Sequence, residues 1–596
     1  MLTETDVLTG GQFLLDDTVP ADVFTPEDFT ETQRMIADTV REFVERSVLP
    51  RREELEFQKK TELGRTLLSE AGEAGLLSVD VPEAYGGMGS TKATTMLVAE
   101  HIARGGSFAV THGGHTGIGT LPIVYFGTPE QKQKYLSRLA TGEIVGAYAL
   151  SEPGSGSDAL SARTTAVLSK DGTHYLLNGT KQYITNAGYA DVIIVFAKVD
   201  GEQFTAFIVE RDTPGFSIGA EEKKMGIHGS STCAVILEDA KVPADHVLGE
   251  IGRGHVVAFN ILNVGRFKLG ASTVGGCKVA LEHAVPYVKQ RKQFGQPLSD
   301  FGLIRAKIAD IVARTYVAES IVYRTAGLMD RAIHGLDALA PDFDRQTIEK
   351  VEEYTIECSI IKVFASESLA LAAEEGLQML GGYGFCQDYP LEQIYRDERI
   401  NRIFEGTNEI NRMLIPGMIL KKALKKELPF FAAAKQVADD LLGPPAFDEA
   451  GEPGFLEEQG KLVTAMKKAC VAALGFAAQK HGENIKDQQE ILSDTADMVM
   501  ETYACESGLL RALKKAEQDG EDSARPMADM VTLYVSDAMD RIAIWGRNVL
   551  AQSAEGDELR TMMAGLRRLS KHVPVNRAKL HDAIAARIIE AGRYTV

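Results

Sequence analysis

Glu405 stands in the stretch with the strongest chemical character, Arg396 to Arg412, which reads R-D-E-R-I-N-R-I-F-E-G-T-N-E-I-N-R. The other charged residues here are spaced as on a solvated helix face. Glu405 instead follows the apolar pair Ile403-Phe404 and precedes a Gly-Thr-Asn break. Apolar surroundings raise the proton affinity of a carboxylate, which suits a general base, and the break lets a backbone N–H turn toward a ligand. Alternatively, E-G-T-N is a helix end with an exposed acid.

Two further motifs suit the binding of a flat, phosphorylated ligand. Tyr148 to Asp158 reads Y-A-L-S-E-P-G-S-G-S-D and offers backbone N–H and hydroxyl donors to phosphate or to the edge of a heteroaromatic ring. In Y-I-T-N-A, Tyr183 and Thr185 are two residues apart on a predicted strand and point to the same side, so an aromatic plane and a hydroxyl donor face one ligand. The alternatives are a flexible turn and an ordinary Tyr–Thr pair.

Two motifs with cations and glycines come later in the chain. Arg291 to Gly295, R-K-Q-F-G, places two cations and an aromatic residue just after a predicted helix, which favours a pyrophosphate clamp. A solvated helix end is the alternative, because cations are favoured there in any case. Gln378 to Phe385, Q-M-L-G-G-Y-G-F, permits close approach of the backbone to a ligand. A plain transition from helix to loop is its alternative.

Composition limits the classes of function. A chain of 596 residues allows three or four domains. Hydrophobic content of 44% and charged content of 25% are typical of a globular protein. The 64 basic and 84 acidic residues give a net charge of −20, which disfavours nucleic acid or an anionic membrane as the main partner. A local basic pocket for phosphates stays compatible with this balance.

The cysteines and the N-terminus indicate a compartment. The six cysteines are scattered, without a C-x-x-C pair or a histidine at metal spacing, so we interpret them as reduced structural thiols. No apolar run approaches the roughly 20 residues that span a bilayer, although peripheral contact with a membrane stays open. The N-terminus, M-L-T-E-T-D, lacks a basic region or an Arg-rich transit pattern. We therefore expect a cytoplasmic protein.

Helical elements dominate the first quarter of the chain. A loose leader is expected to about Phe24, followed by a helix start at Thr25, with Pro26 in its first turn and Asp28 reaching back. Further helices are predicted over Leu67–Ala74 and Thr91–Ala103. The segment Phe108–Gly119 is rich in glycine, at a cost of about 1 kcal/mol per helical site relative to alanine. These glycines leave space either for a ligand or for close packing of helices.

The middle of the chain predicts β structure. Lys170-Asp171-Gly172 and Asn178-Gly179 are hairpin signals, and β-branched and aromatic runs surround them. Helical periodicity resumes near Gly254, and a linker rich in glycine and proline separates a last helical region. The predicted domains are an N-terminal helical domain over 25–146, a middle β domain over 147–249, a four-helix-bundle domain over 250–428, a linker over 429–455 and an extra C-terminal helical domain over 456–596.

Five motifs in register resemble one family. S-E-P-G-S-G-S-D, Y-I-T-N-A, R-K-Q-F-G, Q-M-L-G-G-Y-G-F and I-F-E-G-T-N-E-I occur in the order and approximate spacing of the acyl-CoA dehydrogenases, over about Asp28 to Leu424. The tail after the linker resembles the extra C-terminal domain of the very-long-chain branch. The resemblance implies a mostly α fold with a central β domain: a helical bundle, a β-barrel-like domain, a second helical bundle and a C-terminal helical domain.

The resemblance also implies a site for FAD between the β domain and the second bundle. Glu405 is then the catalytic base, Tyr183 stacks on the flavin where the family often has Trp, and Thr185 bonds near flavin N5. The residues expected to bind FAD are Tyr148, Leu150, Ser151, Gly156, Ser157, Tyr183, Ile184, Thr185, Arg291, Gln293, Phe294, Gln378, Met379, Leu380, Gly381, Gly382, Thr407 and Glu409. Those expected to bind the substrate are Ser157, Asn263, Arg266, Glu405 and Gly406.

By this resemblance the chain converts a fatty acyl-CoA to the trans-2-enoyl-CoA and passes electrons to an electron-transferring flavoprotein. Arg291 and Gln378 reach the FAD of a neighbouring subunit, which implies a homodimer. One branch of the family carries the base beside the substrate arginine, but Gly265 stands there in this chain. An oxidase that returns electrons to oxygen is an alternative. A DNA-binding relative of the fold is another, against which the acidic composition argues.

Chain length of the substrate is predicted from the glycine-rich segment. In this family the acyl tail runs between helices of the first and third domains, and Phe108–Gly119 lies where the tail ends. Gly113, Gly114 and Gly117 leave that end open, and each further buried CH₂ adds about 0.8 kcal/mol to binding. We therefore expect a preference for long chains such as palmitoyl.

Overall fold

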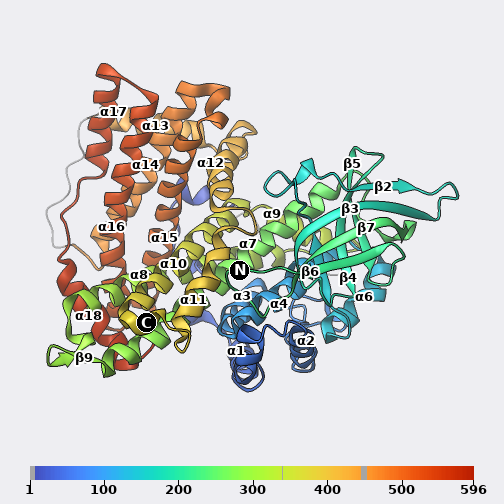
Figure 1. Cartoon of the computed structure of the whole chain (residues 1–596). Helices are drawn as coiled ribbons and strands as arrows, with labels where there is room; N and C mark the ends of the chain where they lie inside the picture. The colour runs from blue at the N-terminus through green and yellow to red at the C-terminus, as the bar shows by residue number, and fades with distance from the viewer. Residues whose placement is uncertain (1–6, 338–339, 444–452) are drawn as a thin grey trace.

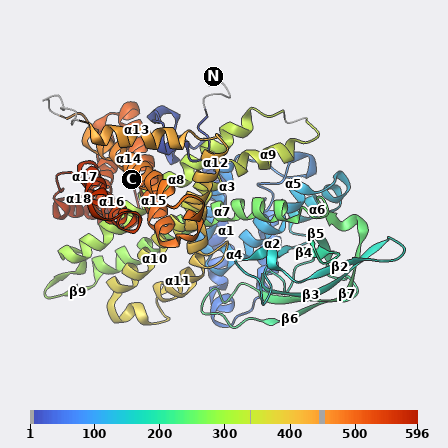
Figure 2. The same ribbon diagram turned by 90° about the horizontal axis from the view of Figure 1, so that it is seen from above.

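The computed structural model describes residues 7–337, 340–443 and 453–596. The chain forms a helical, a β and a second helical domain in that order, followed by the extra helical domain (Figure 1). Seen from above, the β domain and the extra domain occupy opposite ends of the molecule, with the second helical domain between them (Figure 2). The predicted order of domain types is therefore confirmed.

The N-terminal domain is built from capped helices. Thr30, Thr91 and Thr128 each accept a backbone N–H from the first turn of the helix that follows. The helix predicted to start at Thr25 is a single 3₁₀ turn, Pro26–Asp28, closed by the expected capping box. The helices are α1 (Glu31–Phe43), α2 (Leu63–Glu73), α3 (Lys92–Ile102), α4 (Ser107–Gly113), α5 (Leu121–Phe126) and α6 (Pro129–Thr141).

The β domain is one eight-stranded sheet in the order β6-β7-β3-β2-β4-β5-β8, with β1 parallel to β4. Seven of the eight residues of β4, V-I-I-V-F-A-K-V, are buried, which explains a continuous apolar run instead of strict alternation. The strands are β1 (Gly146–Ala149), β2 (Thr165–Leu168), β3 (His174–Thr185), β4 (Val192–Val199), β5 (Gln203–Glu210), β6 (Phe216–Glu221), β7 (Thr232–Pro243) and β8 (Val247–Leu248).

One of the two predicted hairpins is wrong. Asp171 and Gly172 form the turn between β2 and β3, as expected. Asn178-Gly179 instead lies inside the long strand β3, at a register shift against β7. A side chain at Gly179 would come within 2.4 Å of Thr164 Oγ1, so the glycine serves a close approach inside the sheet and not a turn.

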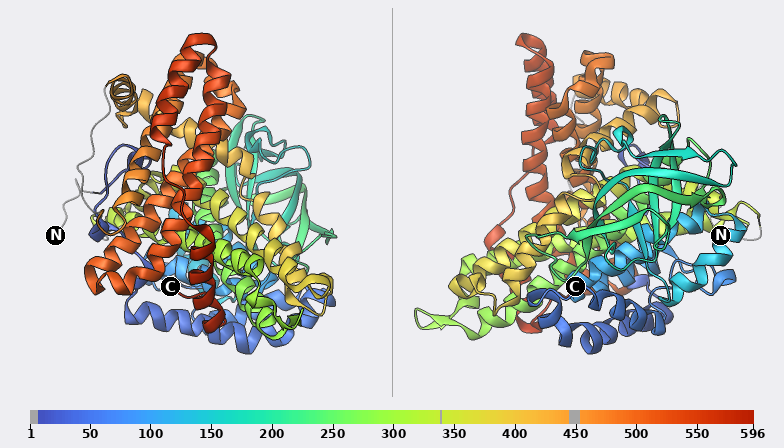
Figure 3. Two further views of the ribbon diagram at one scale, coloured as in Figure 1. Left: turned by 90° about the vertical axis from the view of Figure 1, so that its left-hand side faces the viewer. Right: turned by 45° about the vertical axis from the view of Figure 1, so that its right-hand side comes forward.

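Two helical layers complete the chain. The second helical domain comprises α7 (Gly254–Gln290), α8 (Gly302–His334), α9 (Phe343–Glu352), α10 (Thr355–Leu380), α11 (Pro390–Glu398) and α12 (Asn408–Leu424). The extra domain follows with α13 (Phe430–Leu442), α14 (Glu457–His481), α15 (Gln489–Asp519), α16 (Glu521–Ser553), α17 (Gly556–Leu569) and α18 (Arg577–Ala591). Its long helices stand beside one another (Figure 3). The predicted linker over 429–455 contains helix α13, and its residues 444–452 lie outside the described residues.

The leader is packed, contrary to expectation. Phe13 and Leu14 are buried, and the Phe13 ring lies 4.5 Å from that of Tyr503 in α15. The Gly11 N–H donates to Glu357 Oε1 of α10 at 2.7 Å. The apolar run Phe13-Leu14-Leu15 is the sequence signal for this packing. The leader therefore lies between the second helical domain and the extra domain.

A buried ionic network joins four parts of the chain. Glu319 of α8 accepts from Lys278 of α7 and, at 2.6 Å, from Arg511 of α15. Arg511 also pairs with Glu27 of the 3₁₀ turn Pro26–Asp28 at 2.7 Å, and Lys278 pairs with Glu100 of α3 at 2.5 Å. Buried charges are tolerated where each has partners. The extra domain is thus attached through paired charges as well as apolar packing.

One helix among the described residues, 457–487 with α14 as its main part, is long and apolar enough by composition to cross a bilayer. Just over half of its apolar window, 56%, is buried inside the protein. Met466, Ala473 and Ala477 on it pack into the core. It is therefore packed as a core helix, and the absence of a membrane span stays a prediction.

Candidate functional site

Glu405 lies in a short loop between a 3₁₀ turn, Arg399–Arg402, and α12. Its φ is +58°, in the left-handed region that non-glycine residues seldom occupy, and Gly406 follows with φ +79°. Such strain costs on the order of 1–3 kcal/mol and persists only where surrounding contacts hold it. The predicted break after Glu405 is confirmed, and it turns the side chain inward instead of ending a helix with an exposed acid.

The Glu405 carboxylate lies directly over Gly265 of α7. A Cβ at Gly265 would come within 2.6 Å of Glu405 Oε2, so a side chain there and the glutamate in this position exclude one another. Glu405 and Gly265, the two positions at which the resemblance places the base in different branches, are therefore neighbours in the structure. A side chain at position 265 would have to displace the Glu405 carboxylate from this place.

Arg266, the neighbour of Gly265, holds the loop in place. Its Nε donates to the Glu405 carbonyl at 3.2 Å, and its Nη1 donates to Asn263 Oδ1 at 3.0 Å. Asn263 in turn donates from Nδ2 to Thr355 Oγ1 at 3.0 Å. Arg266 and Asn263 are both buried. Of these two predicted substrate-side residues, Arg266 contacts the main chain of Glu405, and Asn263 supports Arg266 from behind.

The electrostatics of Glu405 are those of a base. Burial raises its pKa to about 7, against the opposing effects of Arg266 and Lys362. Its Oε2 is buried and has no hydrogen-bond partner among the described residues. The pKa of Tyr148 is raised well above its usual range by burial and then by Glu405, and its hydroxyl donates to the Ala258 carbonyl at 3.4 Å. Glu405 therefore has one carboxylate oxygen without a hydrogen-bond partner and a pKa near neutral pH.

Glu405 also offers a hydrogen-bond donor. In the described part of the chain its backbone N–H reaches no acceptor, and the same holds for the Gly406 N–H. The first N–H groups of α12 follow directly, and a helix N-terminus favours negative charge. A carbonyl or developing oxyanion placed here finds a donor ready, next to the base.

The S-E-P-G-S-G-S-D loop leaves β1 and is fixed by two residues the sequence analysis missed. Lys181 Nζ donates to Glu152 Oε1 at 2.7 Å and to the Leu150 carbonyl at 3.2 Å, and both charged side chains are buried. Glu152 also accepts the Thr164 backbone N–H at 3.1 Å. A lysine at a buried position of a strand is the signal for such a partner. Of the predicted residues in the loop, Ser151 is half-buried, whereas Gly156 and Ser157 are exposed.

Tyr183 and Thr185 flank the buried Ile184 at the end of β3, where the strand has a register shift against β7 between Lys181 and Ile184. That both side chains face one ligand stays a prediction. Tyr183 has φ +61° and its side chain is 63% exposed, which leaves an aromatic plane uncovered. Ile184 is buried in the β core, so its side chain is not available to a ligand. Thr185 lies against the glycine-rich segment, 3.0 Å from where a Cβ of Gly114 would be.

The remaining predicted residues form a second group, far from Glu405 within this chain. Arg291, Gln293 and Phe294 belong to a projecting hairpin, β9 (Lys292–Gln293) with β10 (Gln296–Pro297), at the opposite end from the β domain (Figure 1). Phe294 is 94% exposed with φ +52°, and the Arg291 guanidinium lies 5.7 Å from the ring centre of Tyr383.

Gln378–Gly382 meets this hairpin at the end of α10. Gln378 is exposed, and no atom lies within 4 Å of a Cβ built at Gly381 or Gly382. Met379 and Leu380 point into the core, so only their backbone is available to a ligand. A single chain therefore has two separate groups of predicted residues, one around Glu405 and Tyr183 and one around the β9–β10 hairpin. The second group contains exposed aromatic residues and open glycines.

Two predicted residues at the start of α12 differ in role. Thr407 caps the helix, accepting the Ile410 N–H at 3.3 Å, while Glu409 is exposed. Asn408 and Lys362, which the sequence analysis did not single out, meet here at 2.6 Å, both buried. Lys362 interrupts the apolar run I-I-K-V-F-A of α10, and a lone lysine in such a run signals a buried partner.

The glycines of Phe108–Gly119 divide into two kinds. The segment is α4 followed by a π-helical stretch, Gly114–Gly119. Gly114 and Gly119 serve close packing, because a Cβ would come within 3.0 Å of Thr185 and 2.6 Å of the Gly146 backbone. Gly113 has no neighbour within 4 Å of a Cβ, and at Gly117 the nearest atom is Lys268 Cδ at 3.6 Å. Only Gly113 has open space at the Cβ position, a Cβ at Gly117 would make ordinary van der Waals contact, and Gly114 is closely packed. The open end for a long acyl tail therefore stays a prediction, and Gly114 does not support it.

Comparisons with known proteins agree along the whole chain. The chain matches the N-terminal, middle and C-terminal domains of acyl-CoA dehydrogenases over residues 30–143, 147–240 and 252–419, and a further acyl-CoA dehydrogenase C-terminal domain over 465–568. It is 48% identical to a probable acyl-CoA dehydrogenase of Bacillus subtilis over 591 residues, 99% of both chains.

A more distant relative and a solved structure extend the comparison. The human very long-chain specific acyl-CoA dehydrogenase is 34% identical over 562 residues, 89% of this chain and 82% of that protein. A crystal structure of an acyl-CoA dehydrogenase from Bacillus anthracis complexed with FAD matches 99% of this chain and 100% of its own. That match has a TM-score of 0.96 and 49% identity.

Proposed function

The chain belongs to the acyl-CoA dehydrogenase family, and from this premise we propose that it oxidises long-chain fatty acyl-CoA to trans-2-enoyl-CoA in fatty-acid β-oxidation. One observation carries the proposal: the Glu405 carboxylate lies over Gly265 with Oε2 unpaired, while Arg266 holds its main chain. A base with this freedom and a pKa near 7 suits removal of a weakly acidic proton.

The residues present fit FAD, the cofactor of this family. Tyr183 and Phe294 expose aromatic surface in strained conformations, and Arg291 with the glycines 381 and 382 offers charge and open backbone for a pyrophosphate. Ser157 and Gly156 leave donors free in the loop after β1. When bound, FAD supplies the acceptor for the hydride that leaves the substrate β carbon.

The residues of this chain perform the proton transfer. Glu405 in its ionised form accepts the proton from the α carbon through Oε2. Arg266 keeps the loop in place through the Glu405 carbonyl, so the carboxylate does not have to be ordered during the reaction. The free backbone N–H of Glu405 donates to the thioester carbonyl, where negative charge develops; such a donor contributes about 3–4 kcal/mol at comparable sites.

We infer that electrons pass to an electron-transferring flavoprotein, the acceptor that membership of the family favours. An oxidase that uses oxygen is the alternative, and no residue named above selects against it. DNA binding is disfavoured because the net charge of the chain is −20. We propose a cytoplasmic location, in line with six scattered cysteines that the sequence analysis interprets as reduced thiols.

We further propose a homodimer. The β9–β10 hairpin with Arg291 and Phe294 lies at the opposite end of the chain from the β domain with Tyr183 (Figure 1), and a partner copy would bring such a hairpin to each FAD. Phe294 at 94% exposed, Phe385 at 84% and Leu303 at 81% form apolar surface that burial in a dimer would cover. Light scattering should return about twice the chain mass of 64.7 kDa, and a monomer or a tetramer would contradict the proposal.

Purified protein tests the reaction directly. We expect a yellow flavoprotein whose absorbance bleaches when acyl-CoA is added without oxygen. A series from butyryl- to stearoyl-CoA with a dye acceptor should give its highest kcat/KM for long chains, consistent with the open space at Gly113. Hydrogen peroxide formed in air at the rate of substrate turnover would instead identify an oxidase. Failure of every acyl-CoA to bleach the flavin would overturn the proposed function.

A further inference from the structure

A chain of polar contacts runs from the loop of Glu405 to the extra C-terminal domain. It begins at Asn408, the first residue of α12, whose Nδ2 donates to Glu367 Oε1 of α10 at 3.0 Å. Both carboxylate oxygens of Glu367 accept from Arg412, at 2.8 and 3.0 Å. Arg412 donates in turn from Nε to Asp497 Oδ1 of α15 at 2.9 Å. Three contacts thus join the first turn of α12 to the extra domain.

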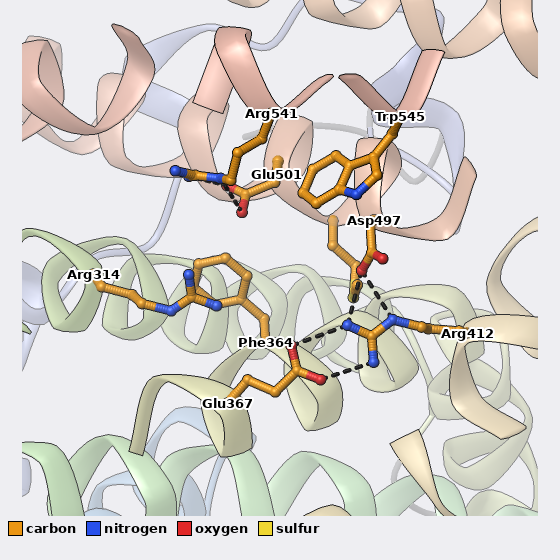
Figure 4. A pocket seen from close by; sticks show the side chains of 9 residues that line it. Arg314, Phe364, Glu367, Arg412, Asp497, Glu501, Arg541 and Trp545 are labelled. Carbon is orange, nitrogen blue, oxygen red and sulfur yellow. Dashed lines mark hydrogen bonds and ion pairs between the residues drawn. The ribbon is translucent and has the colours of Figure 1, made fainter. Parts of the chain in front are cut away.

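Figure 4 shows Arg412 held between Glu367 and Asp497 on the wall of a cavity of about 160 Å³. The cavity lies between α8, α10 and α12 on one side and α15 and α16 on the other. Its charged lining consists of three arginines and three carboxylates: Arg314, Arg412, Arg541, Glu367, Asp497 and Glu501. Because the positive and negative charges are equal in number, the lining favours neither an anionic nor a cationic ligand. The ion pairs instead connect the second helical domain to the extra domain.

The same turn of α12 controls the surroundings of the base. Asn408 Oδ1 accepts from Lys362 Nζ at 2.6 Å, and the Lys362 side chain is completely buried. Asn411 Nδ2 donates to the Gly406 carbonyl at 2.8 Å, next to Glu405. Both asparagines thus fix groups that lie around the carboxylate: one an ammonium, the other the strained backbone.

The charged and titratable groups that face Glu405 come from three elements. Arg266 is on α7, Tyr148 is on β1 and Lys362 is on α10. Arg266 is held by Asn263, and Tyr148 donates to Ala258, both outside the chain of contacts. Only Lys362 is held by a member of it. A disturbance at Asp497 should therefore reach Glu405 through Lys362 and the first turn of α12.

We propose that Asp497 of the extra domain is a positioning residue for the dehydrogenation reaction, which acts through Arg412, Glu367 and Asn408 to keep the Glu405 loop in its reactive geometry. The inference rests on Glu405 acting as the base. The Arg412–Glu367 contact is bidentate and charge-assisted, the hydrogen-bond geometry with the highest directional precision. In catalytic sites a displacement of about 1 Å is enough to cost about 10²-fold in rate, so a small loosening is measurable.

The test uses the full-length, FAD-loaded protein with three substitutions. Asp497→Ala removes the acceptor for Arg412, whereas Asp497→Asn keeps an oxygen at that position. Asp529→Ala is the matched control, because Asp529 also accepts from an arginine, Arg587, at 2.9 Å, but inside the extra domain. The two aspartate side chains are similarly shielded, with 16% of Asp497 and 10% of Asp529 exposed. If Asp497→Ala does not fold, Glu367→Gln interrupts the same contacts one step nearer to the loop.

Two readouts follow. Anaerobic flavin reduction by acyl-CoA should slow on the order of tenfold in Asp497→Ala. The acid limb of its pH profile should move to higher pH, because Lys362 no longer lowers the pKa of Glu405 as effectively. Asp497→Asn should approach wild type, and Asp529→Ala should match it.

Hydrogen exchange, measured with and without acyl-CoA, should be faster in Asp497→Ala for peptides that cover residues 403–412, and unchanged in Asp529→Ala. Wild-type exchange and an unshifted pH profile in Asp497→Ala, with only a loss of thermal stability, would overturn the inference. If none of the acyl-CoA substrates reduces the flavin of the wild-type protein, the proposed function fails. The exchange comparison still decides whether Asp497 holds the loop.

Discussion

Two glutamates in this molecule, the buried Glu319 and the half-buried Glu405 with its buried Oε2, have opposite surroundings. Glu319 of α8 accepts from Lys278, Arg511 and the Tyr594 hydroxyl, and these partners hold its pKa at about 2 although burial alone would raise it. Glu405 has an unpaired oxygen, and burial raises its pKa to about 7. Burial is common to both, so the number of donors decides which carboxylate stabilises the fold and which is available to accept a proton.

The backbone shows the same contrast. Glu319 lies in the middle of a regular helix, while Glu405, Tyr183 and Phe294 all have positive φ. Each of these three residues was predicted to contact ligand or cofactor. Strain of this kind is retained where surrounding contacts over-determine it. The paired charges around Glu319 therefore stabilise the fold, whereas the strained backbone at Glu405, Tyr183 and Phe294 costs stability.

The largest expected effect comes from removing the base. Glu405→Gln should keep FAD but slow flavin reduction by more than ~10³-fold, because the amide cannot accept the α proton. Absorbance of bound flavin gives the cofactor content, and anaerobic stopped flow gives the rate. Reduction at near-normal rate by the variant would refute the assignment of Glu405 as base.

Removing an ion-pair partner of Glu319 should lower stability instead of activity. Arg511→Met removes the partner of both Glu319 and Glu27 and should lower the free energy of unfolding by about 3–5 kcal/mol, since it leaves buried carboxylates short of a cation. Urea unfolding followed by the fluorescence of Trp545, the single tryptophan, reports on the extra domain. Flavin reduction in the folded variant should stay near wild type; a loss as large as that of Glu405→Gln would erase the distinction between the two regions.

The two carboxylates should also give opposite pH dependence. Flavin reduction should rise about tenfold per pH unit and level off above about 7, where Glu405 is ionised. For stability, the raised pKa of Glu405 favours the fold below its ordinary 4.5, and this contribution is lost as the pH rises toward 7. The lowered pKa of Glu319 stabilises the fold above 4.5, and this contribution is lost as the pH falls toward 2.

Thermal unfolding of wild type, Glu405→Gln and Glu319→Gln across pH 3.5 to 8 checks these signs. The gap between wild type and Glu405→Gln should change between pH 4.5 and 7, and the gap for Glu319→Gln below pH 4.5. Gaps that vary in the same direction would show that the two sites do not differ as described.

The smallest effect separates open from packed positions in one segment. Gly117→Leu fills space beside Lys268 and should lower activity on palmitoyl-CoA roughly tenfold more than on octanoyl-CoA, since buried methylenes contribute about 0.8 kcal/mol each. Gly119→Ala, which meets the Gly146 backbone, is the control and should lower stability without changing the ratio of the two activities. Equal losses on both substrates in Gly117→Leu would withdraw the preference for long chains.

Local patterns predicted the catalytic loop well and the junctions poorly. The break after Glu405, the strand through Tyr183 and the end of a helix before R-K-Q-F-G follow from residue types within a few positions. The β9–β10 hairpin at R-K-Q-F-G was not predicted. The pairing of Glu319 with Arg511 spans 192 residues, and no local pattern contains it. Asn178-Gly179 was mistaken for a turn because the signal for a tight turn and the signal for close approach inside a sheet are the same glycine.

Leader and extra domain pose a related problem. The leader carries no local pattern of a helix or strand and was predicted to be loose, but a face for Phe13 exists only once α15 is packed. Likewise the glycines of Phe108–Gly119 have one local signature and two roles, which only the neighbours at Thr185, Gly146 and Lys268 separate.

The packed leader sets an order for synthesis. Glu27 and Arg511 are 484 residues apart, so the segment that carries Phe13 leaves the ribosome long before its partner helix exists. At about 5–20 residues per second, the delay is on the order of 25–100 s. During that time Phe13 lacks the face of α15 against which it packs, while the β domain and the helices before it can already fold. The last helices to emerge therefore complete the fold from both ends of the chain, and release of an incomplete chain leaves its own N-terminus exposed to proteases.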